Sequence, residues 1–96
     1  MAPKIVLVTG CSSGIGLAAA VLLASDKEKR FKVYATIRNL AKKDNLEEKG
    51  KDFLGDTLIT KAMDVCSEDS VNDVVQEILA THQRIDILSK FLFVSN

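Results

Sequence analysis

Residues 9–16 read Thr-Gly-Cys-Ser-Ser-Gly-Ile-Gly and separate two apolar segments of different character. Residues 5–8 before them are largely β-branched, and residues 15–24 after them are apolar and rich in alanine. Ser12 and Ser13 carry hydroxyls of the kind that cap helices. The stretch therefore predicts a strand, a glycine-rich turn and a helix, in that order.

The rest of the chain repeats this alternation. Residues 32–37 predict a second strand and residues 57–62 a third, because both are rich in β-branched and alternating apolar positions. Between them we expect a short, charged helix over residues 41–49, with Asn39 as its cap. A fourth strand is expected over residues 85–88.

The clearest helix precedes that fourth strand. Its apolar residues fall at i, i+3, i+4, i+7 and i+8, and they are Val71, Val74, Val75, Ile78 and Leu79. Ser70 and Asp73 are expected to form a variant of the capping box, and His82 to lie near the helix's last carbonyls. Strands alternating with helices predict an α/β fold, the first half of a doubly wound parallel-sheet (Rossmann) fold with about four strands and helices on both faces.

Composition fits one globular domain, since 47% of the 96 residues are hydrophobic and 27% are charged. Thirteen basic residues balance thirteen acidic ones, so no nucleic-acid partner is expected. Cys11 and Cys66 are too few for a secreted disulfide scaffold. We expect them to be reduced packing residues in an intracellular, cytosolic protein. No apolar run is long enough to span a membrane.

The glycine turn has the position of a phosphate-binding loop, because the N–H groups at a helix N-terminus bind anions. Gly10 can adopt backbone angles closed to other residues, Gly14 leaves room for a pyrophosphate, and Gly16 lets the helix pack closely on the strand. Ser12 and Ser13 add hydroxyl donors for phosphate oxygens. A glycine-rich turn can also simply end a strand and start a helix, but the strand-turn-helix context favours binding.

The pattern T-G-x-x-x-G-x-G resembles the signature of the short-chain dehydrogenase/reductase family. Residues 33–38, 63–65 and 84–88 also look like landmarks of that family and occur in its order. Within the family, residues 10–17 and 64–71 look most like the retinol dehydrogenase and 17β-hydroxysteroid dehydrogenase branch. The resemblance covers nearly all of the chain.

The resemblance implies an NADP-binding half-domain over residues 1–88, in which the glycine turn, with Ile15, holds the cofactor. Asp64 and Val65 would contact the adenine. Arg38 stands where an NAD-type site places a carboxylate, and it can pair with a 2′-phosphate, so NADP is favoured over NAD. Arg38 could instead be a solvated arginine at a strand end, and Asp64 a turn or capping residue.

Family members transfer a proton with a Tyr-x-x-x-Lys pair and an upstream Ser. The single tyrosine here, Tyr34, is followed four residues later by Arg38, so no catalytic residue is assigned. Residues 89–96 depart from the family pattern, and we expect a truncated or alternatively terminated product.

The expected function is therefore the NADP-binding part of an oxidoreductase acting on a retinoid or steroid, inactive alone. In the parent protein it could lie on the cytosolic face of a membrane. One alternative is a nucleotide-binding or interaction module that pairs with a full-length relative or forms a homo-oligomer. Another is a product without stable function.

Overall fold

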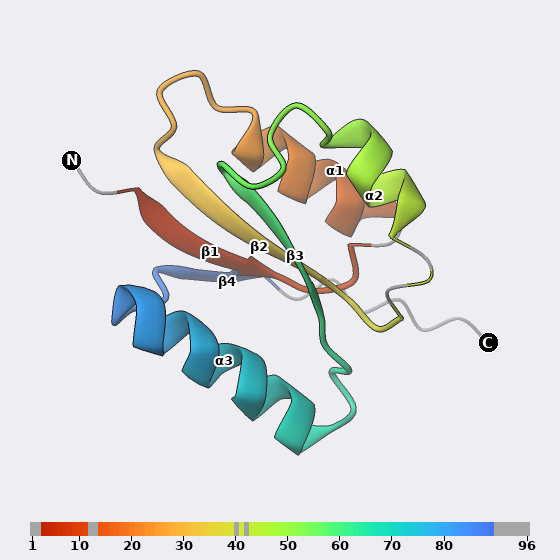
Figure 1. Ribbon diagram of the computed structural model, residues 1–96, viewed down its shortest axis with the longest axis vertical. Helices are drawn as coiled ribbons and strands as arrows, with labels where there is room; N and C mark the ends of the chain where they lie inside the picture. Colours follow the sequence, from red (N-terminus) through yellow and green to blue (C-terminus); the bar gives the residue numbers. More distant parts are fainter. Residues whose placement is uncertain (1–2, 12–13, 40, 42, 90–96) are drawn as a thin grey trace.

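A computed structural model describes residues 3–11, 14–39, 41 and 43–89 of the chain (Figure 1). Strands and helices alternate as predicted. The elements in chain order are β1 (Lys4–Val8), α1 (Gly14–Ala24), β2 (Phe31–Ile37), α2 (Asp44–Lys49), β3 (Leu58–Ala62), α3 (Glu68–His82) and β4 (Ile87–Ser89).

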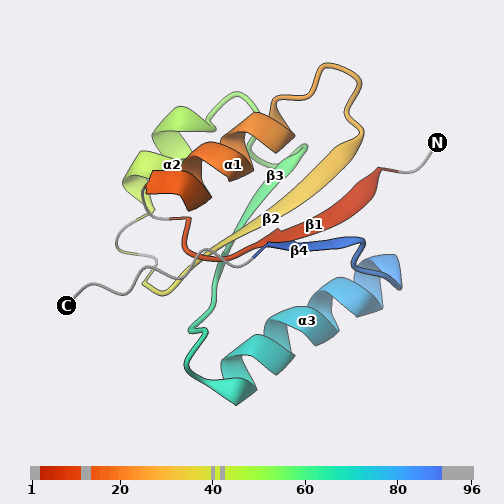
Figure 2. The ribbon, with the colours of Figure 1, turned by 180° about the vertical axis from the view of Figure 1, so that it is seen from behind.

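The four strands form one parallel sheet in the order β3-β2-β1-β4. Val6 of β1 lies opposite Val33 of β2 and Ile87 of β4, and Val33 in turn lies opposite Leu58 of β3. Helices α1 and α2 cover one face of the sheet and α3 covers the other (Figures 1 and 2). The predicted α/β class, with a parallel sheet between helices, is confirmed.

Alternate residues of β1 face opposite layers, which explains why a strand covered on both sides reads as a continuous apolar run. Val6 and Val8 belong to the cluster under α1, whereas Ile5 and Leu7 belong to the cluster under α3. All four are at most 2% exposed. The core therefore consists of two layers, one on each side of the sheet.

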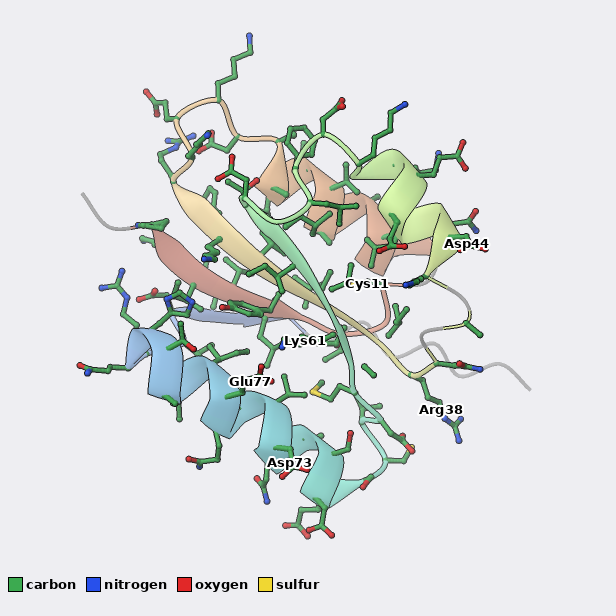
Figure 3. All side chains as sticks on the ribbon, in the orientation of Figure 1. Cys11, Arg38, Asp44, Lys61, Asp73 and Glu77 are labelled. Atoms are coloured by element: carbon green, nitrogen blue, oxygen red, sulfur yellow. The ribbon has the colours of Figure 1, made fainter. Side chains whose placement is uncertain are left out.

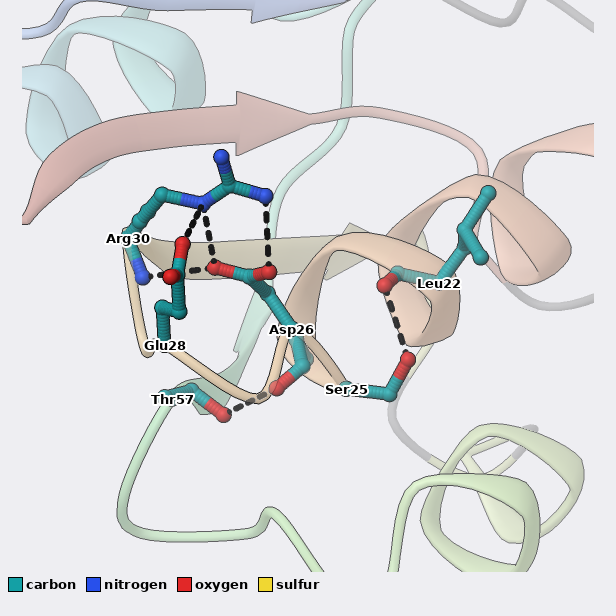
Figure 4. Close-up of polar contacts among 7 residues, drawn as sticks. Leu22, Ser25, Asp26, Glu28, Arg30 and Thr57 are labelled. Atoms are coloured by element: carbon teal, nitrogen blue, oxygen red, sulfur yellow. Dashed lines mark hydrogen bonds and ion pairs between the residues drawn. The ribbon is translucent and has the colours of Figure 1, made fainter.

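The loop between α1 and β2 is closed by polar contacts at the amino edge of the sheet (Figure 4). Asp26 accepts hydrogen bonds from the Arg30 backbone N–H at 2.8 Å and from its guanidinium at 3.0 Å. The Thr57 hydroxyl, which is buried, donates to the carbonyl of Ala24 at 2.6 Å. These contacts fix the end of α1 beside the start of β3.

The predicted cap of the second helix was wrong. Helix α2 begins at Asp44 rather than residue 41, and its N-cap Lys43 makes no side-chain capping bond. Asn39 instead accepts the N–H of Ala41 at 2.9 Å, which closes a local turn before the helix. Asn and Asp side chains accept hydrogen bonds from the backbone two residues further along the chain as readily as they cap helices. Here that local turn forms in place of the start of the longer predicted helix.

Helix α3 is capped by Ser67, not by the predicted pair of Ser70 and Asp73. Ser67 has an extended backbone and its hydroxyl accepts the N–H of Ser70 at 3.3 Å. Ser70 lies inside the helix, and its own hydroxyl accepts the N–H of Asp64 at 2.9 Å. The helix therefore begins one turn earlier than the apolar stripe suggests.

The fourth strand begins at Ile87, two residues later than predicted. The N–H of Ile5 donates to a carboxylate oxygen of Asp86 at 2.7 Å, and Asp86 donates its own N–H to the carbonyl of Ile5 at 2.8 Å. A side chain thus occupies the position that a strand carbonyl would take, and regular pairing starts only after it.

Within the described residues, no helix is long and apolar enough to cross a membrane.

Candidate functional site

The candidate cofactor site lies at the carboxyl edge of the sheet. The glycine turn follows β1, Arg38 follows β2, and Asp64 and Val65 follow β3. In a parallel sheet these strand ends meet along one edge, and Figure 1 shows the three connections leaving β1, β2 and β3 together. The fold thus brings together segments that are more than fifty residues apart in the sequence.

The glycine turn has the backbone that its residues suggest. Gly10 has a φ of 67° and Gly14 a φ of 65°, both in the left-handed region that disfavours other residues. Both glycines are exposed. Ser12 and Ser13, the predicted hydroxyl donors, lie outside the described residues.

Gly16 sets the distance between α1 and the turn. A Cβ atom at this position would lie 2.2 Å from the carbonyl oxygen of Gly10 and 3.0 Å from that of Thr9. The first turn of α1 therefore rests directly on the backbone that follows β1. That arrangement points the helix N-terminus at the space beyond the strand, and α1 has no acidic residue in its first turn.

Cys11 anchors the turn to β2. Its N–H donates to the carbonyl of Thr36 at 3.0 Å, and its thiol donates to the carbonyl of Val8 at 3.3 Å. The Thr36 hydroxyl donates to the same Val8 carbonyl at 2.9 Å. Cys11 is completely buried, and this burial raises the pKa of its thiol to about 12. The expectation that Cys11 is a packing residue is confirmed, but the role of Thr36 was missed.

Thr36 could have been noticed in the sequence, because its hydroxyl lies between the apolar residues Ala35 and Ile37 near the end of the strand. Cys66 differs from the expectation. It is exposed in the turn before α3 and is not a packing residue.

Arg38 and Asp64 lie together at the edge, with the Arg38 Nε 3.9 Å from the Asp64 Oδ2. The Arg38 side chain is 80% exposed, and Figure 3 shows it extending outward from the end of β2. Asp64 is held more firmly, because its Oδ1 accepts the N–H of Cys66 at 2.9 Å and its own N–H donates to Ser70. The turn role considered for Asp64 is therefore real, and its second carboxylate oxygen faces a cation.

Two apolar side chains are exposed after β1 and β3, at the carboxyl edge of the sheet. Ile15, in the first turn of α1, is 71% exposed, and Val65, after β3, is 40% exposed. Leu22, further along α1, is exposed to the same extent at 72%, and single exposed apolar side chains are common on protein surfaces. Ile15 lies beside the glycine turn and Val65 follows Asp64, and a cofactor contact for either residue stays a prediction.

These residues fit the chemistry of a dinucleotide phosphate. Backbone N–H groups at the start of α1 suit a pyrophosphate, and the Arg38 guanidinium suits a further phosphate. A carboxylate and exposed apolar side chains suit a heteroaromatic ring with an amino group. Across residues 3–11, 14–39, 41 and 43–89 no cluster of three or more side chains suited to metal binding occurs.

Comparison with known proteins agrees with this fold. Residues 4–91 match the short chain dehydrogenase family. Human retinol dehydrogenase 8 is 54% identical over 70 residues, which cover 73% of this chain and 22% of that protein. Human 17-beta-hydroxysteroid dehydrogenase type 1 is 43% identical over 90 residues, which cover 92% of this chain and 27% of that protein.

Among solved structures, L-sorbose reductase from Gluconobacter frateurii, complexed with NADPH and L-sorbose, superimposes with a TM-score of 0.77 at 26% identity. The match covers all of this chain and 35% of that one. Because the family match covers residues 4–91, which are most of this chain, the chain belongs to the short chain dehydrogenase family. It spans about a quarter of the length of the retinol and steroid dehydrogenases that it resembles.

Proposed function

We propose that this chain binds the adenosine and pyrophosphate part of NADP(H) at the carboxyl edge of its sheet. The glycine turn carries the proposal: two exposed glycines with positive φ lead directly into the N-terminus of an uncharged helix that Gly16 seats on the turn. Such a backbone presents N–H groups to a phosphate at short range. Gly10, Gly14, Ile15 and Gly16 belong to this part of the site, together with Ser12 and Ser13.

The preference for NADP over NAD rests on Arg38. No carboxylate follows β2 to accept the ribose hydroxyls, and the exposed guanidinium offers a planar set of donors to a 2′-phosphate. Asp64 and Val65 would contact the adenine, with Asp64 accepting from the exocyclic amine. The solved NADPH complex with the same fold supports this choice.

The reaction served is oxidation or reduction of a retinoid or steroid, in line with the retinol and hydroxysteroid dehydrogenases that the chain resembles. Nicotinamide supplies the hydride chemistry when the cofactor is bound. The 96 residues contain no Tyr-x-x-x-Lys pair to move the accompanying proton, so we expect no turnover by this chain alone. We place the protein in the cytosol.

A second candidate is an interaction module that pairs with a full-length relative or with another copy. The observation that favours it is the sheet order, which leaves β4, only three residues long, at one edge of the described sheet. Edge strands carry backbone groups that a further strand can pair with. Co-purification with a full-length relative, or a dimer in solution, would support this role.

The proposed function is tested by titrating the chain with NADP and NAD in parallel, for the parent sequence, Arg38→Ala and Lys51→Ala. Losing a charge-assisted pair costs about 1.5–3 kcal/mol, so Arg38→Ala should weaken NADP roughly tenfold or more and leave NAD nearly unchanged. Lys51 is exposed in the loop before β3, at the amino edge of the sheet and away from the candidate site. Lys51→Ala therefore controls for the loss of one positive charge. Calorimetry measures both affinities.

A Gly14→Ala variant tests the turn itself, because an alanine at a φ of 65° is strained and its methyl group narrows the approach to the backbone. We expect this variant to lose both cofactors while its circular dichroism spectrum is retained. Equal losses of NADP and NAD in Arg38→Ala would contradict the assignment of Arg38. Undiminished binding by a folded Gly14→Ala would contradict the assignment of the turn.

A further inference from the structure

Two threonines of the sheet are buried in matching settings at its opposite edges. Thr36, 1% exposed, lies near the carboxyl end of β2, and Thr57, 6% exposed, lies just before β3 at the amino edge. Each backbone carbonyl accepts an N–H from a neighbouring segment, from Cys11 at 3.0 Å and from Val33 at 2.7 Å respectively. Each hydroxyl donates to a main-chain carbonyl of another element. The two residues therefore differ mainly in which part of the chain they stabilise.

Thr57 acts at the end of α1 that is remote from the glycine turn. Its hydroxyl donates at 2.6 Å to the carbonyl of Ala24, the last residue of that helix. The 11 residues of α1 separate this contact from the helix N-terminus by about 15 Å, at a rise of about 1.5 Å per residue. Thr57 therefore stabilises the fold away from the candidate site.

Thr36 acts where the chain leaves β1 and enters the glycine turn. Its hydroxyl donates at 2.9 Å to the carbonyl of Val8, the last residue of β1, and the Cys11 thiol donates to the same carbonyl at 3.3 Å. The Thr36 carbonyl accepts the N–H of Cys11. One residue of β2 thus contacts the chain on both sides of Gly10, before it at Val8 and after it at Cys11.

These two contacts matter because of the glycine between them. Gly10 has a φ of 67°, and a glycine loses more conformational freedom than other residues when its backbone is fixed. A turn that is already fixed before a ligand arrives does not lose that freedom on binding. Val8 and Cys11 are completely buried whereas Gly10 is exposed. The contacts with β2 therefore lie beneath the turn and leave its outer surface open.

We propose that Thr36 is a positioning residue that fixes the glycine turn in the form that binds phosphate. Its buried side chain contacts no ligand and acts through the Val8 carbonyl. Because NADP and NAD share the pyrophosphate, Thr36 sets the affinity for both cofactors and leaves the choice between them to Arg38. This role rests on the proposed function, since it assigns the turn to a phosphate, but the order of the turn can be measured without a cofactor.

Three variants separate this role from a general contribution to stability. Thr36→Val removes the hydroxyl but keeps the β-branched shape and the carbonyl that accepts the N–H of Cys11. The Val8 carbonyl then keeps the thiol of Cys11, which is a weak donor. Thr57→Val is the matched control, because it makes the same change in a buried threonine at the amino edge. Thr36→Ser restores the hydroxyl and lacks only a methyl group.

The first measurement needs no cofactor and uses NMR order parameters of the backbone N–H groups of residues 9–11 in the 96-residue chain. The Val8 carbonyl and the N–H of residue 9 belong to one peptide plane, so loss of the Thr36 hydroxyl should loosen the turn from its start. We expect values of about 0.85 in the parent, Thr57→Val and Thr36→Ser, and a fall toward about 0.6 in Thr36→Val.

The second measurement is calorimetric titration of the same variants with NADP and with NAD. Loss of one neutral hydrogen bond should weaken both cofactors about three- to tenfold in Thr36→Val, by the same factor for each. Thr57→Val and Thr36→Ser should bind both cofactors as the parent does. The unchanged ratio of the two affinities distinguishes Thr36 from Arg38, whose removal should weaken NADP alone.

Parent-like order parameters at residues 9–11 in a folded Thr36→Val would overturn the role of Thr36, as would equal losses of affinity in Thr36→Val and Thr57→Val. If the parent binds neither cofactor, the proposed function fails, while the order parameters still decide whether Thr36 fixes the turn. Thr36→Ala, which removes the hydroxyl without adding a methyl group in its place, is used if Thr36→Val does not fold.

Discussion

Gly16→Ala tests whether contact between α1 and the glycine turn, rather than helix propensity, explains the glycine at this position. The added Cβ would lie 2.2 Å from the carbonyl oxygen of Gly10 and 2.8 Å from its carbonyl carbon. Both atoms belong to the backbone, and the neighbouring Cys11 N–H is hydrogen-bonded to β2. A rotamer change cannot relieve the overlap, so the helix has to withdraw by about 1 Å from a close-packed contact.

The magnitude follows from two opposing terms. Alanine is about 1 kcal/mol better than glycine inside a helix, which favours the variant. Overpacking costs about 1–3 kcal/mol, and rigid backbone on the receiving side places this case near the upper end. We therefore expect a net loss of about 2 kcal/mol, which lowers the Tm of a domain of this size by roughly 8–16 °C.

Thermal unfolding followed by circular dichroism measures this change, with Ala18→Gly as the matched control. Ala18 is exposed in the same helix, so its substitution reports helix propensity alone, with an expected loss of about 1 kcal/mol. If Gly16→Ala unfolds at or above the Tm of the parent, propensity dominates and the close contact does not explain the glycine.

Two further predictions concern α3 and the cysteines. Ser67→Ala should lower the free energy of unfolding by about 0.5–2 kcal/mol, because it removes the hydroxyl that caps α3, whereas Asp73→Ala should have little effect. Denaturant unfolding measures both variants, and a larger loss of stability in Asp73→Ala than in Ser67→Ala would refute the assigned cap. Cys66 should react rapidly with a thiol reagent near pH 8, whereas Cys11 should react only on unfolding, because Cys11 is buried and burial raises its pKa to about 12. Mass spectrometry locates the label, and modification of Cys11 in the folded chain would contradict its burial.

The sequence alone determined the order of strands and helices and the left-handed backbone at Gly10. These features depend on local preferences: apolar residues repeat with the period of a strand or a helix, and Gly10 occupies backbone angles that few residues tolerate. The close packing at Gly16 was also predictable, because the strand and the helix that it joins are adjacent in the chain. Cap residues were predicted less well, since Ser67 and Ser70 are equally good caps by type.

Only the tertiary structure decided which distant side chains meet. The pairing of β2 with β3 places Ile37 opposite Ala62, and this register brings Arg38 within 3.9 Å of Asp64. Tyr34 and His82, separated by 48 residues, meet because α3 packs across the sheet with its last turn over β2. These contacts depend on the strand register and on how α3 packs on the sheet. A register shift of one residue would turn the side chains to the opposite face of the sheet and break the contacts, and no local pattern in the sequence specifies them.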